Sequence, residues 1–341
     1  MRVLLISANR LRIPYPVYPL GMDHVAGAIA SHHPVQILDL CQVEQEGDVA
    51  QAVAAEVITF KPELVGISLR NVDNVDGLGS ISFTAYYKAV VAAVRRATSA
   101  PLVLGGAGFT LFPRHYMETL GADYGLAGEG ERLPALLDAL ELGEPPPDLP
   151  GLYVGTRLAA PRTPWDGAMG SRSLLPPQQL AFYLGGGGMI NLQSKRGCPH
   201  RCGYCTYPSI EGHGVRSMDP GQVAATAREL QESGARYLWI IDASFNCDEA
   251  QNLALARAFR AEGVTVPWGA FFTPTPMSDG YWAELAAAGL THVEFGTESL
   301  SPTVLAGYRK PFRVAQVQRA HEQCLDAGLH VAHFFLLGGP G

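Results

Sequence analysis

The segment SKRGCPHRCGYCTYP, residues 194–208, places Cys198, Cys202 and Cys205 within eight positions of a chain that has six cysteines in 341 residues. The spacing CxxxCxxC directly follows a strand-like run and is flanked and interrupted by glycine. A short loop of this kind can wrap one inorganic centre with three thiolates, whereas a disulfide between two of them would leave the third without a partner. The segment therefore predicts a metal centre with three cysteine ligands.

The ligand count narrows the identity of that centre. Structural zinc normally takes four protein ligands, and here the fourth would have to come from Cys247, His200 or His213. An iron–sulfur cluster held by three cysteines keeps one iron open for a substrate or cofactor. The sequence favours the iron–sulfur cluster, and zinc or chance clustering are the alternatives.

Bulk composition limits the class of protein. The chain is 47% hydrophobic and 17% charged, and its length exceeds what one core usually supports, which favours two domains. Formal net charge is -7, and the basic residues are scattered, so a nucleic-acid partner is disfavoured. Apolar runs stay far below the roughly 20 residues of a membrane span. We therefore expect a soluble cytoplasmic protein, where clustered thiols usually bind metals or catalyse.

Residues 1–142 alternate strand-like and helical runs, as in a doubly wound, Rossmann-like parallel sheet. Strands are expected at 2–8, 35–40, 64–69 and 101–106, and helices at 21–33, 48–62 and 84–100. In such sheets ligands bind at the carboxyl ends of the strands. We expect a binding site at that edge.

Residues 143–187 concentrate proline and glycine, which predicts an interdomain linker. Residues 188–341 resume the alternation, with strands expected near 189–195, 237–242, 266–272, 291–297 and 330–339 and helices near 220–233, 248–262, 279–288 and 313–327. This pattern predicts an α/β fold that ends in a partial (β/α) barrel. Because its last strand would have an open edge, we expect the sequence to be truncated at the carboxyl terminus.

The cysteine loop resembles the signature of the radical S-adenosylmethionine enzymes, in which an aromatic residue, here Tyr204, precedes the last cysteine. The resemblance implies that Cys198, Cys202 and Cys205 hold a 4Fe-4S cluster whose open iron chelates S-adenosylmethionine. In the family, one electron from the cluster cleaves the sulfonium and releases a 5'-deoxyadenosyl radical. Such a radical needs a buried, water-poor cavity.

Three later segments carry weaker parts of the same resemblance. Segment 241–249 resembles the end of the second barrel strand, 293–301 resembles the fourth, and 334–341 resembles the glycine turn of the fifth. The resemblance implies that Asp242, Ser244 and Asn246 contact the methionine moiety of the cofactor. It also implies that Glu298 contacts the ribose and carboxylate and that Gly338 contacts the adenine. The alternative for the polar residues is a helix cap or a surface turn.

The amino-terminal half resembles the cobalamin-binding domains that precede many such barrels, on the pieces YPLG (18–21), GISLRN (66–71), LGGAGFT (104–110) and GEGE (128–131). The resemblance implies a corrin and nucleotide-tail site at Ser68, Arg70, Gly105, Gly106, Gly128 and Glu129. Small residues are required where backbone lies against a flat macrocycle. The alternatives are that the glycine pair simply ends a strand and that Arg70 is a surface residue.

One departure concerns the cobalt ligand. Cobalamin domains that ligate cobalt with histidine carry Asp-x-His-x-x-Gly after the first strand, but this chain has no histidine there, and His24 stands at the wrong spacing. We expect cobalamin to bind without a histidine below the cobalt, which would tune its reactivity because an axial donor sets a metal's potential.

The resemblance implies a cobalamin-dependent radical enzyme that transfers a methyl group, carried as methylcobalamin, to an unactivated carbon. Its partners would be a small-molecule, lipid or natural-product substrate and an external one-electron donor such as flavodoxin or ferredoxin. The alternatives are a radical enzyme that cyclises or rearranges its substrate, one whose first domain has lost cobalamin, a non-catalytic cobalamin or iron–sulfur sensor, and a zinc module.

Overall fold

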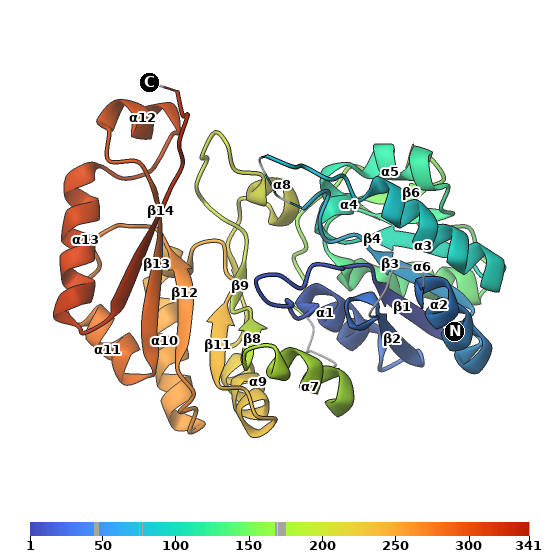
Figure 1. The fold of residues 1–341 in the computed structure, drawn as a ribbon, viewed down its shortest axis with the longest axis horizontal. Coiled ribbons are helices and arrows are strands. Elements are labelled where there is room, and N and C mark those ends of the chain that lie inside the picture. Colours follow the sequence, from blue (N-terminus) through green and yellow to red (C-terminus); the bar gives the residue numbers. More distant parts are fainter. Residues whose placement is uncertain (44–47, 75, 77, 168, 170–174, 341) are drawn as a thin grey trace. The chain divides into compact units, whose positions relative to one another are not determined.

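The structure is a computed structural model that describes residues 1–341 apart from 44–47, 75, 77, 168, 170–174 and 341 (Figure 1). It divides into two compact units, Met1–Phe182 and Tyr183–Gly341. Each unit is built on a largely or wholly parallel sheet, so the α/β class expected from the sequence is confirmed. Within the described ranges, every helix is too short or too polar to cross a membrane.

The first unit contains a seven-stranded sheet in the order β2-β1-β3-β4-β5-β6-β7. Its strands are β1 Val3–Ser7, β2 Val35–Asp39, β3 Leu64–Ser68, β4 Leu102–Gly105, β5 Tyr124–Leu126, β6 Leu152–Val154 and β7 Arg157–Leu158. Its principal helices are α1 Leu20–Ile29, α2 Val49–Phe60, α3 Thr84–Ala97, α4 Ala107–Leu111, α5 Pro113–Leu120 and α6 Leu133–Glu141. All five residues of β1 are buried, as expected for a central parallel strand covered on both faces.

The strand order places a topological switch between β1 and β3. These two strands are parallel neighbours, in register from Val3 opposite Leu64 to Ser7 opposite Ser68. The chain moves to one side of β1 to form β2 and to the other side to form β3. In open α/β sheets, ligands bind at the carboxyl edge beside such a switch. The edge at which the sequence predicted a ligand site is therefore the one that carries the switch.

The segment 143–187, predicted as a linker, contains regular structure. Strands β6 and β7 extend the first sheet as an antiparallel edge, and α7, Pro177–Gly185, follows. Short edge strands tolerate nearby proline because one side of the ladder needs no hydrogen-bond donors. Proline and glycine density marked an irregular region but did not show that part of it completes the first sheet.

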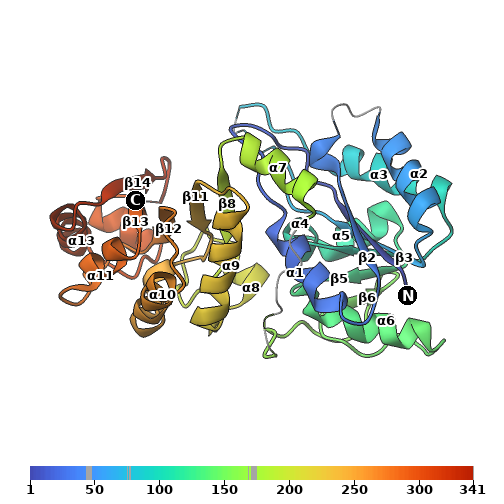
Figure 2. The same ribbon diagram turned by 90° about the horizontal axis from the view of Figure 1, so that it is seen from below.

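The second unit contains a five-stranded parallel sheet in the order β14-β13-β12-β11-β8. Its strands are β8 Met189–Leu192, β11 Tyr237–Ile240, β12 Trp268–Phe272, β13 Leu290–Glu298 and β14 His330–Phe335. The helices, which border the strands in Figure 2, are α9 Pro220–Glu232, α10 Glu249–Ala261, α11 Tyr281–Ala287, α12 Pro302–Gly307 and α13 Val314–Asp326. A small hairpin pairs β9 Lys195–Arg196 with β10 Arg216–Ser217, and α8, Tyr207–Glu211, follows the cysteines.

The two faces of this sheet differ in burial. Phe272 and Phe295 pack against Trp282 of α11 with tilted and edge-on ring contacts, and both are almost fully buried. On the opposite face, Trp239 contacts Phe271, and both are only partly buried. Because side chains alternate along a strand, the helices cover one face and leave the other as the aromatic inner wall of the partial barrel.

Candidate functional site

The cysteine loop lies between β9 and α8, and its sulfurs lie within electrostatic reach of one another. Burial raises the pKa of the Cys198 thiol, and the charges of Cys205 and Cys202 raise it further. Burial also raises the pKa of Cys202, while the Lys310 ammonium opposes that shift. The raised pKa values of Cys198 and Cys202 mean that their thiolates need a strongly positive centre beside them, as a metal centre held by the loop would supply.

The residues that could complete a zinc site are engaged elsewhere. The imidazole of His213 lies 3.2 Å from the Cys198 carbonyl oxygen, and that of His200 lies 3.0 Å from the Thr273 hydroxyl. Burial raises the pKa of Cys247 to about 11. Among the described residues, no group of three His, Cys, Asp or Glu side chains is arranged around a single metal ion.

A buried ion pair joins the start of the cysteine segment to β11. The Lys195 ammonium lies 3.0 Å from the Asp242 carboxylate, and both side chains are at most 1% exposed. Lys195 also donates to the Phe245 carbonyl oxygen at 3.0 Å and to Asn252 Oδ1 at 2.9 Å. The four elements β9, β11, η4 (Phe245–Cys247) and α10 are thus held through one ammonium group.

Asp242 has no oxygen left over for an easy contact with a cofactor. Its carboxylate accepts hydrogen bonds from the backbone N–H groups of Ser194 and Lys195, from the Ser194 hydroxyl and from the Lys195 ammonium. The prediction that Asp242 faces the methionine moiety therefore finds no support in the geometry. Sequence reasoning missed Lys195, although a lysine three residues before the first cysteine was visible.

Ser244 and Asn246, the other predicted contacts of the methionine moiety, take part in a chain of hydrogen bonds. The Thr273 hydroxyl lies 2.8 Å from Ser244 Oγ and 3.0 Å from Nε2 of His200, which is a residue of the cysteine loop. Asn246 donates to the Thr273 carbonyl oxygen at 2.8 Å and accepts from the Thr273 N–H at 2.9 Å. These residues tie the cysteine loop to the ends of β11 and β12, and their contact with a cofactor stays a prediction.

Tyr204, Glu298 and Lys310 form a second polar group beside the cysteines. The Tyr204 hydroxyl donates to Glu298 at 2.8 Å, and the Lys310 ammonium lies 2.9 Å from that hydroxyl and 3.5 Å from Glu298. Burial and the Glu298 charge raise the pKa of Tyr204, so the phenol stays protonated. Glu298 has φ of 64°, a strained conformation for a residue with a side chain. Sequence reasoning found Tyr204 and Glu298 but missed Lys310.

Gly338, the predicted adenine contact, follows β14. Its φ is 80°, and a Cβ placed there would meet no atom within 4 Å. Glycine is therefore required by backbone conformation and not by crowding within the chain. The backbone there is open to a close approach, and the adenine contact remains a prediction.

At the carboxyl edge of the first sheet, Gly105 and Gly106 differ in whether the backbone conformation and the surrounding atoms would allow a side chain. Gly106 has φ of 94° and ψ of 172°, a region that essentially only glycine occupies. A Cβ at Gly106 would lie 2.7 Å from both the Leu69 carbonyl oxygen and Ser68 Oγ, whereas one at Gly105 would lie 3.7 Å from its nearest neighbour. Gly106 is needed by the fold itself, so only Gly105 can report on a ligand.

We expect Gly106→Ala to destabilise the first unit by about 2 kcal/mol or more, from backbone strain and collision with the Leu69 carbonyl. Gly105→Ala is the matched control and should stay within about 1 kcal/mol of the parent, since its Cβ makes an ordinary contact. Urea unfolding followed by far-ultraviolet circular dichroism measures both. Equal midpoints for the two variants would show that the conformation at Gly106 is not as described.

The GEGE segment, residues 128–131, and the adjoining Arg132 contact residues 162–165. The Glu129 carboxylate accepts a hydrogen bond from the Trp165 N–H, and Arg132 donates to the Thr163 and Pro164 carbonyl oxygens. A Cβ at Gly128, whose φ is 99°, would lie 3.1 Å from the Arg162 side chain. Gly128 and Glu129 therefore position residues 162–165, which sequence reasoning did not foresee, and a contact with cobalamin remains a prediction. Ser68 is half-buried and Arg70 is exposed, at the end of β3.

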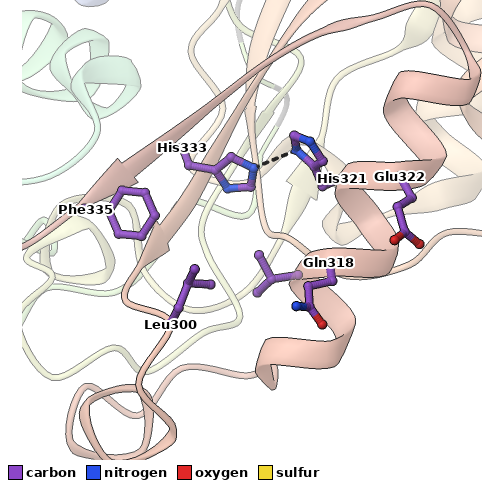
Figure 3. A pocket seen from close by; sticks show the side chains of 7 residues that line it. Leu300, Gln318, His321, Glu322, His333 and Phe335 are labelled. Carbon is purple, nitrogen blue, oxygen red and sulfur yellow. Dashed lines mark hydrogen bonds between the residues drawn. The ribbon is translucent and has the colours of Figure 1, made fainter.

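A pocket of about 220 Å³ lies against β14 and α13 (Figure 3). The His333 ring lies 2.6 Å from the Thr297 hydroxyl through Nδ1 and 3.0 Å from His321 through Nε2. His333 also stacks near Phe295, on the helix-covered face of the sheet. His333 is therefore a hydrogen-bonded histidine on the helix-covered face, outside the aromatic inner wall of the partial barrel.

Comparisons with known proteins agree with both halves of the chain. The Radical SAM superfamily model matches residues 192–341, and the B12 binding domain model matches residues 6–137. The tryptophan 2-C-methyltransferase of Streptomyces laurentii is 27% identical over 99% of this chain and 67% of its own length. The hopanoid C-3 methylase of Methylococcus capsulatus is 23% identical over 92% of this chain and 60% of its own length.

A solved structure extends the likeness to the fold of the whole chain. The radical S-adenosylmethionine methyltransferase TsrM from Kitasatospora setae, with cobalamin and a [4Fe-4S] cluster bound, has a TM-score of 0.90 and 26% identity over 100% of this chain and 70% of its own. The chain thus spans between 60% and 70% of the length of these relatives. Taken with the cysteine loop, these findings show that the chain belongs to the radical S-adenosylmethionine enzymes that carry an amino-terminal cobalamin-binding domain.

Proposed function

We propose that the chain is a cobalamin-dependent radical S-adenosylmethionine enzyme that transfers a methyl group to an unactivated carbon of a small molecule. The observation that carries the proposal is the combination, in one chain, of a three-cysteine loop with a B12 binding domain model over residues 6–137. TsrM, the solved relative with cobalamin and a [4Fe-4S] cluster bound, is a methyltransferase. In the net reaction, one S-adenosylmethionine gives its methyl group to the substrate carbon and leaves as S-adenosylhomocysteine. A second S-adenosylmethionine ends as methionine and 5'-deoxyadenosine, which takes up the C–H hydrogen, and two electrons from an external donor complete the balance.

Each cofactor meets residues that fit it. The three clustered thiols, with the raised pKa values of Cys198 and Cys202, fit a 4Fe-4S cluster. The carboxyl edge at β1 and β3 holds buried amide atoms of two asparagines without hydrogen-bond partners among the described residues, which fits an amide-rich ligand. When bound, the cluster would supply the electron for cleavage of S-adenosylmethionine, and cobalamin would carry the methyl group.

The chain's own residues would bind and orient the cofactors and the substrate. Lys310 and Tyr204 would hold the Glu298 carboxylate in one position beside the cysteine loop, ready to accept hydrogen bonds from a polar ligand. The partly buried Trp239 and Phe271 would offer an apolar, water-poor wall to the carbon skeleton of the substrate. Such a wall suits a substrate with a planar or apolar part, including a lipid or natural product.

The remaining assignments are proposals drawn from the chemistry. Reductive cleavage needs one electron from outside, so a flavodoxin or ferredoxin is the expected donor. Clustered thiols persist reduced in the cytoplasm, which is the expected location. Cofactor contacts at Ser68, Arg70 and Gly105 would lie on the cobalamin edge, and those at Ser244, Asn246, Glu298 and Gly338 on the S-adenosylmethionine side.

The test begins with anaerobic reconstitution using iron, sulfide and hydroxocobalamin, followed by desalting and metal analysis. We expect about four irons, as a 4Fe-4S cluster requires, and one cobalt per chain. Reductant and methyl-labelled S-adenosylmethionine are then added with candidate acceptors, and label in the acceptor is measured beside 5'-deoxyadenosine. Iron without cobalt would contradict the cobalamin role. Cleavage to 5'-deoxyadenosine without methylation of any acceptor, despite bound cobalt, would favour cyclisation or rearrangement.

A further inference from the structure

Two asparagines that sequence reasoning did not single out lie just beyond the switch-point strands. Asn9 follows β1 by two residues, and Asn71 follows β3 by three. Because β1 and β3 are parallel and in register, both residues stand at the same carboxyl edge of the sheet. This is the edge where a doubly wound sheet binds its ligand.

Asn9 carries an unmet donor. The residue is 5% exposed, and its Nδ2 has no hydrogen-bond partner within the described part of the chain. Its Oδ1 accepts from the Leu11 N–H at 3.3 Å, so the amide is oriented with its oxygen turned to the backbone and its N–H₂ group left over. A buried amide donor without an acceptor is costly for the fold, and native proteins rarely leave one unexplained.

Asn71 carries the complementary group. Its Oδ1 is buried and has no hydrogen-bond donor among the residues described. Its backbone carbonyl is already occupied by the Tyr87 hydroxyl, so the main chain at Asn71 is fixed from α3. One strand end thus offers a free donor and its neighbour a free acceptor.

We propose that Asn9 and Asn71 are binding residues for the polar periphery of cobalamin, an inference that rests on the proposed function. Asn9 donates to an acceptor oxygen of the ligand, and Asn71 accepts from a ligand N–H. Primary carboxamides, which surround the corrin ring, supply both groups. The acceptor for Asn9 can also come from the nucleotide tail, whose phosphate and ribose carry only oxygen at their edges.

The paired Asn→Asp variants separate the donor role of Asn9 from the acceptor role of Asn71. The change removes the N–H₂ donor of an asparagine but keeps a side-chain oxygen that accepts. Asn9→Asp keeps the oxygen that accepts from Leu11 but removes the donor, so we expect cobalamin to bind about tenfold more weakly or worse, from one lost buried hydrogen bond. Asn71→Asp keeps an acceptor and should lose clearly less affinity than Asn71→Leu, which removes it. Gln36→Glu is the control for an amide-to-acid change elsewhere in the first unit, at an exposed side chain of β2.

Affinity is measured by equilibrium dialysis of hydroxocobalamin against the full chain, with thermal unfolding of each ligand-free variant to verify the fold. A second arm uses cobinamide, which lacks the nucleotide tail. If the Asn9→Asp loss persists with cobinamide, the acceptor belongs to the corrin periphery; if it vanishes, the acceptor belongs to the tail.

The binding results that would overturn the roles of Asn9 and Asn71 differ from those that would overturn the proposed function. No cobalamin binding by the parent chain would overturn the cobalamin role as a whole. Tight binding by the parent and equal binding by Asn9→Asp and Asn9→Leu would overturn the role of Asn9 alone. An Asn71→Leu variant that binds as well as Asn71→Asp would likewise remove Asn71 from the site.

Discussion

Replacement of Lys195 by Met should destabilise the second unit by about 3–5 kcal/mol, because it leaves the Asp242 carboxylate buried without its counter-charge. The pair is fully desolvated, since the side chains are 1% and 0% exposed, so solvent screening gives little relief. The loss also removes hydrogen bonds to the Phe245 carbonyl and to Asn252. We therefore expect the end of β11 and the start of the cysteine segment to loosen together.

Urea unfolding followed by tryptophan fluorescence suits this measurement, because Trp239, Trp268 and Trp282 lie in the second unit and only Trp165 lies in the first. Arg228→Met is the matched control: it breaks an exposed pair with Glu232, and should cost no more than about 1 kcal/mol. Adding Asp242→Asn to Lys195→Met should recover part of the loss by removing the stranded charge. Similar losses for Lys195→Met and Arg228→Met would show that the buried pair contributes nothing special.

Substitution of Cys202 by Ala is expected to abolish iron–sulfur loading and, with it, any cleavage of S-adenosylmethionine. Two thiolates cannot hold a cluster that needs three protein ligands. Iron per chain after reconstitution should fall from about four, the content of a 4Fe-4S cluster, to near zero. Cobalamin binding should persist, because the predicted cobalamin residues belong to the first unit and the cysteine loop to the second.

Cys324→Ala is the control for this experiment. Cys324 is a fully buried cysteine of α13 whose pKa is raised by burial alone, to about 12. Its loss should cost some stability and leave the iron content unchanged. Full iron content in Cys202→Ala would mean that another residue, with Cys247 the first suspect, serves as a ligand.

The sequence predicted the cysteine loop and the rhythm of strands because these depend on local spacing. Three cysteines in eight positions can serve one centre wherever the loop lies, and buried parallel strands reveal themselves as apolar runs. The same local logic failed between 143 and 187, where proline and glycine density concealed β6 and β7. Those strands are short, and they exist because β5 offers an edge to pair with.

Side-chain roles were harder to predict for a different reason. The resemblance of segment 241–249 implied a cofactor contact for Asp242, whereas the partner that the structure gives its carboxylate, Lys195, is 47 residues away in sequence. Gly106 was expected to make room for a corrin, yet the carbonyl of Leu69 already requires glycine there. Local patterns give a residue's type and its place on a strand, whereas partners distant in sequence decide what its atoms do.

The sequence by itself determined that this chain carries a three-cysteine metal loop in one α/β half and a strand-end ligand edge in the other, because both depend on residue type and short-range order. Only the tertiary structure decided which polar groups are already satisfied. It enclosed Asp242 with Lys195, brought Lys310 to Glu298, and left Asn9 and Asn71 with unmet hydrogen bonds. Burial makes the difference, since a polar group withdrawn from water must find its partner within the fold or in a ligand.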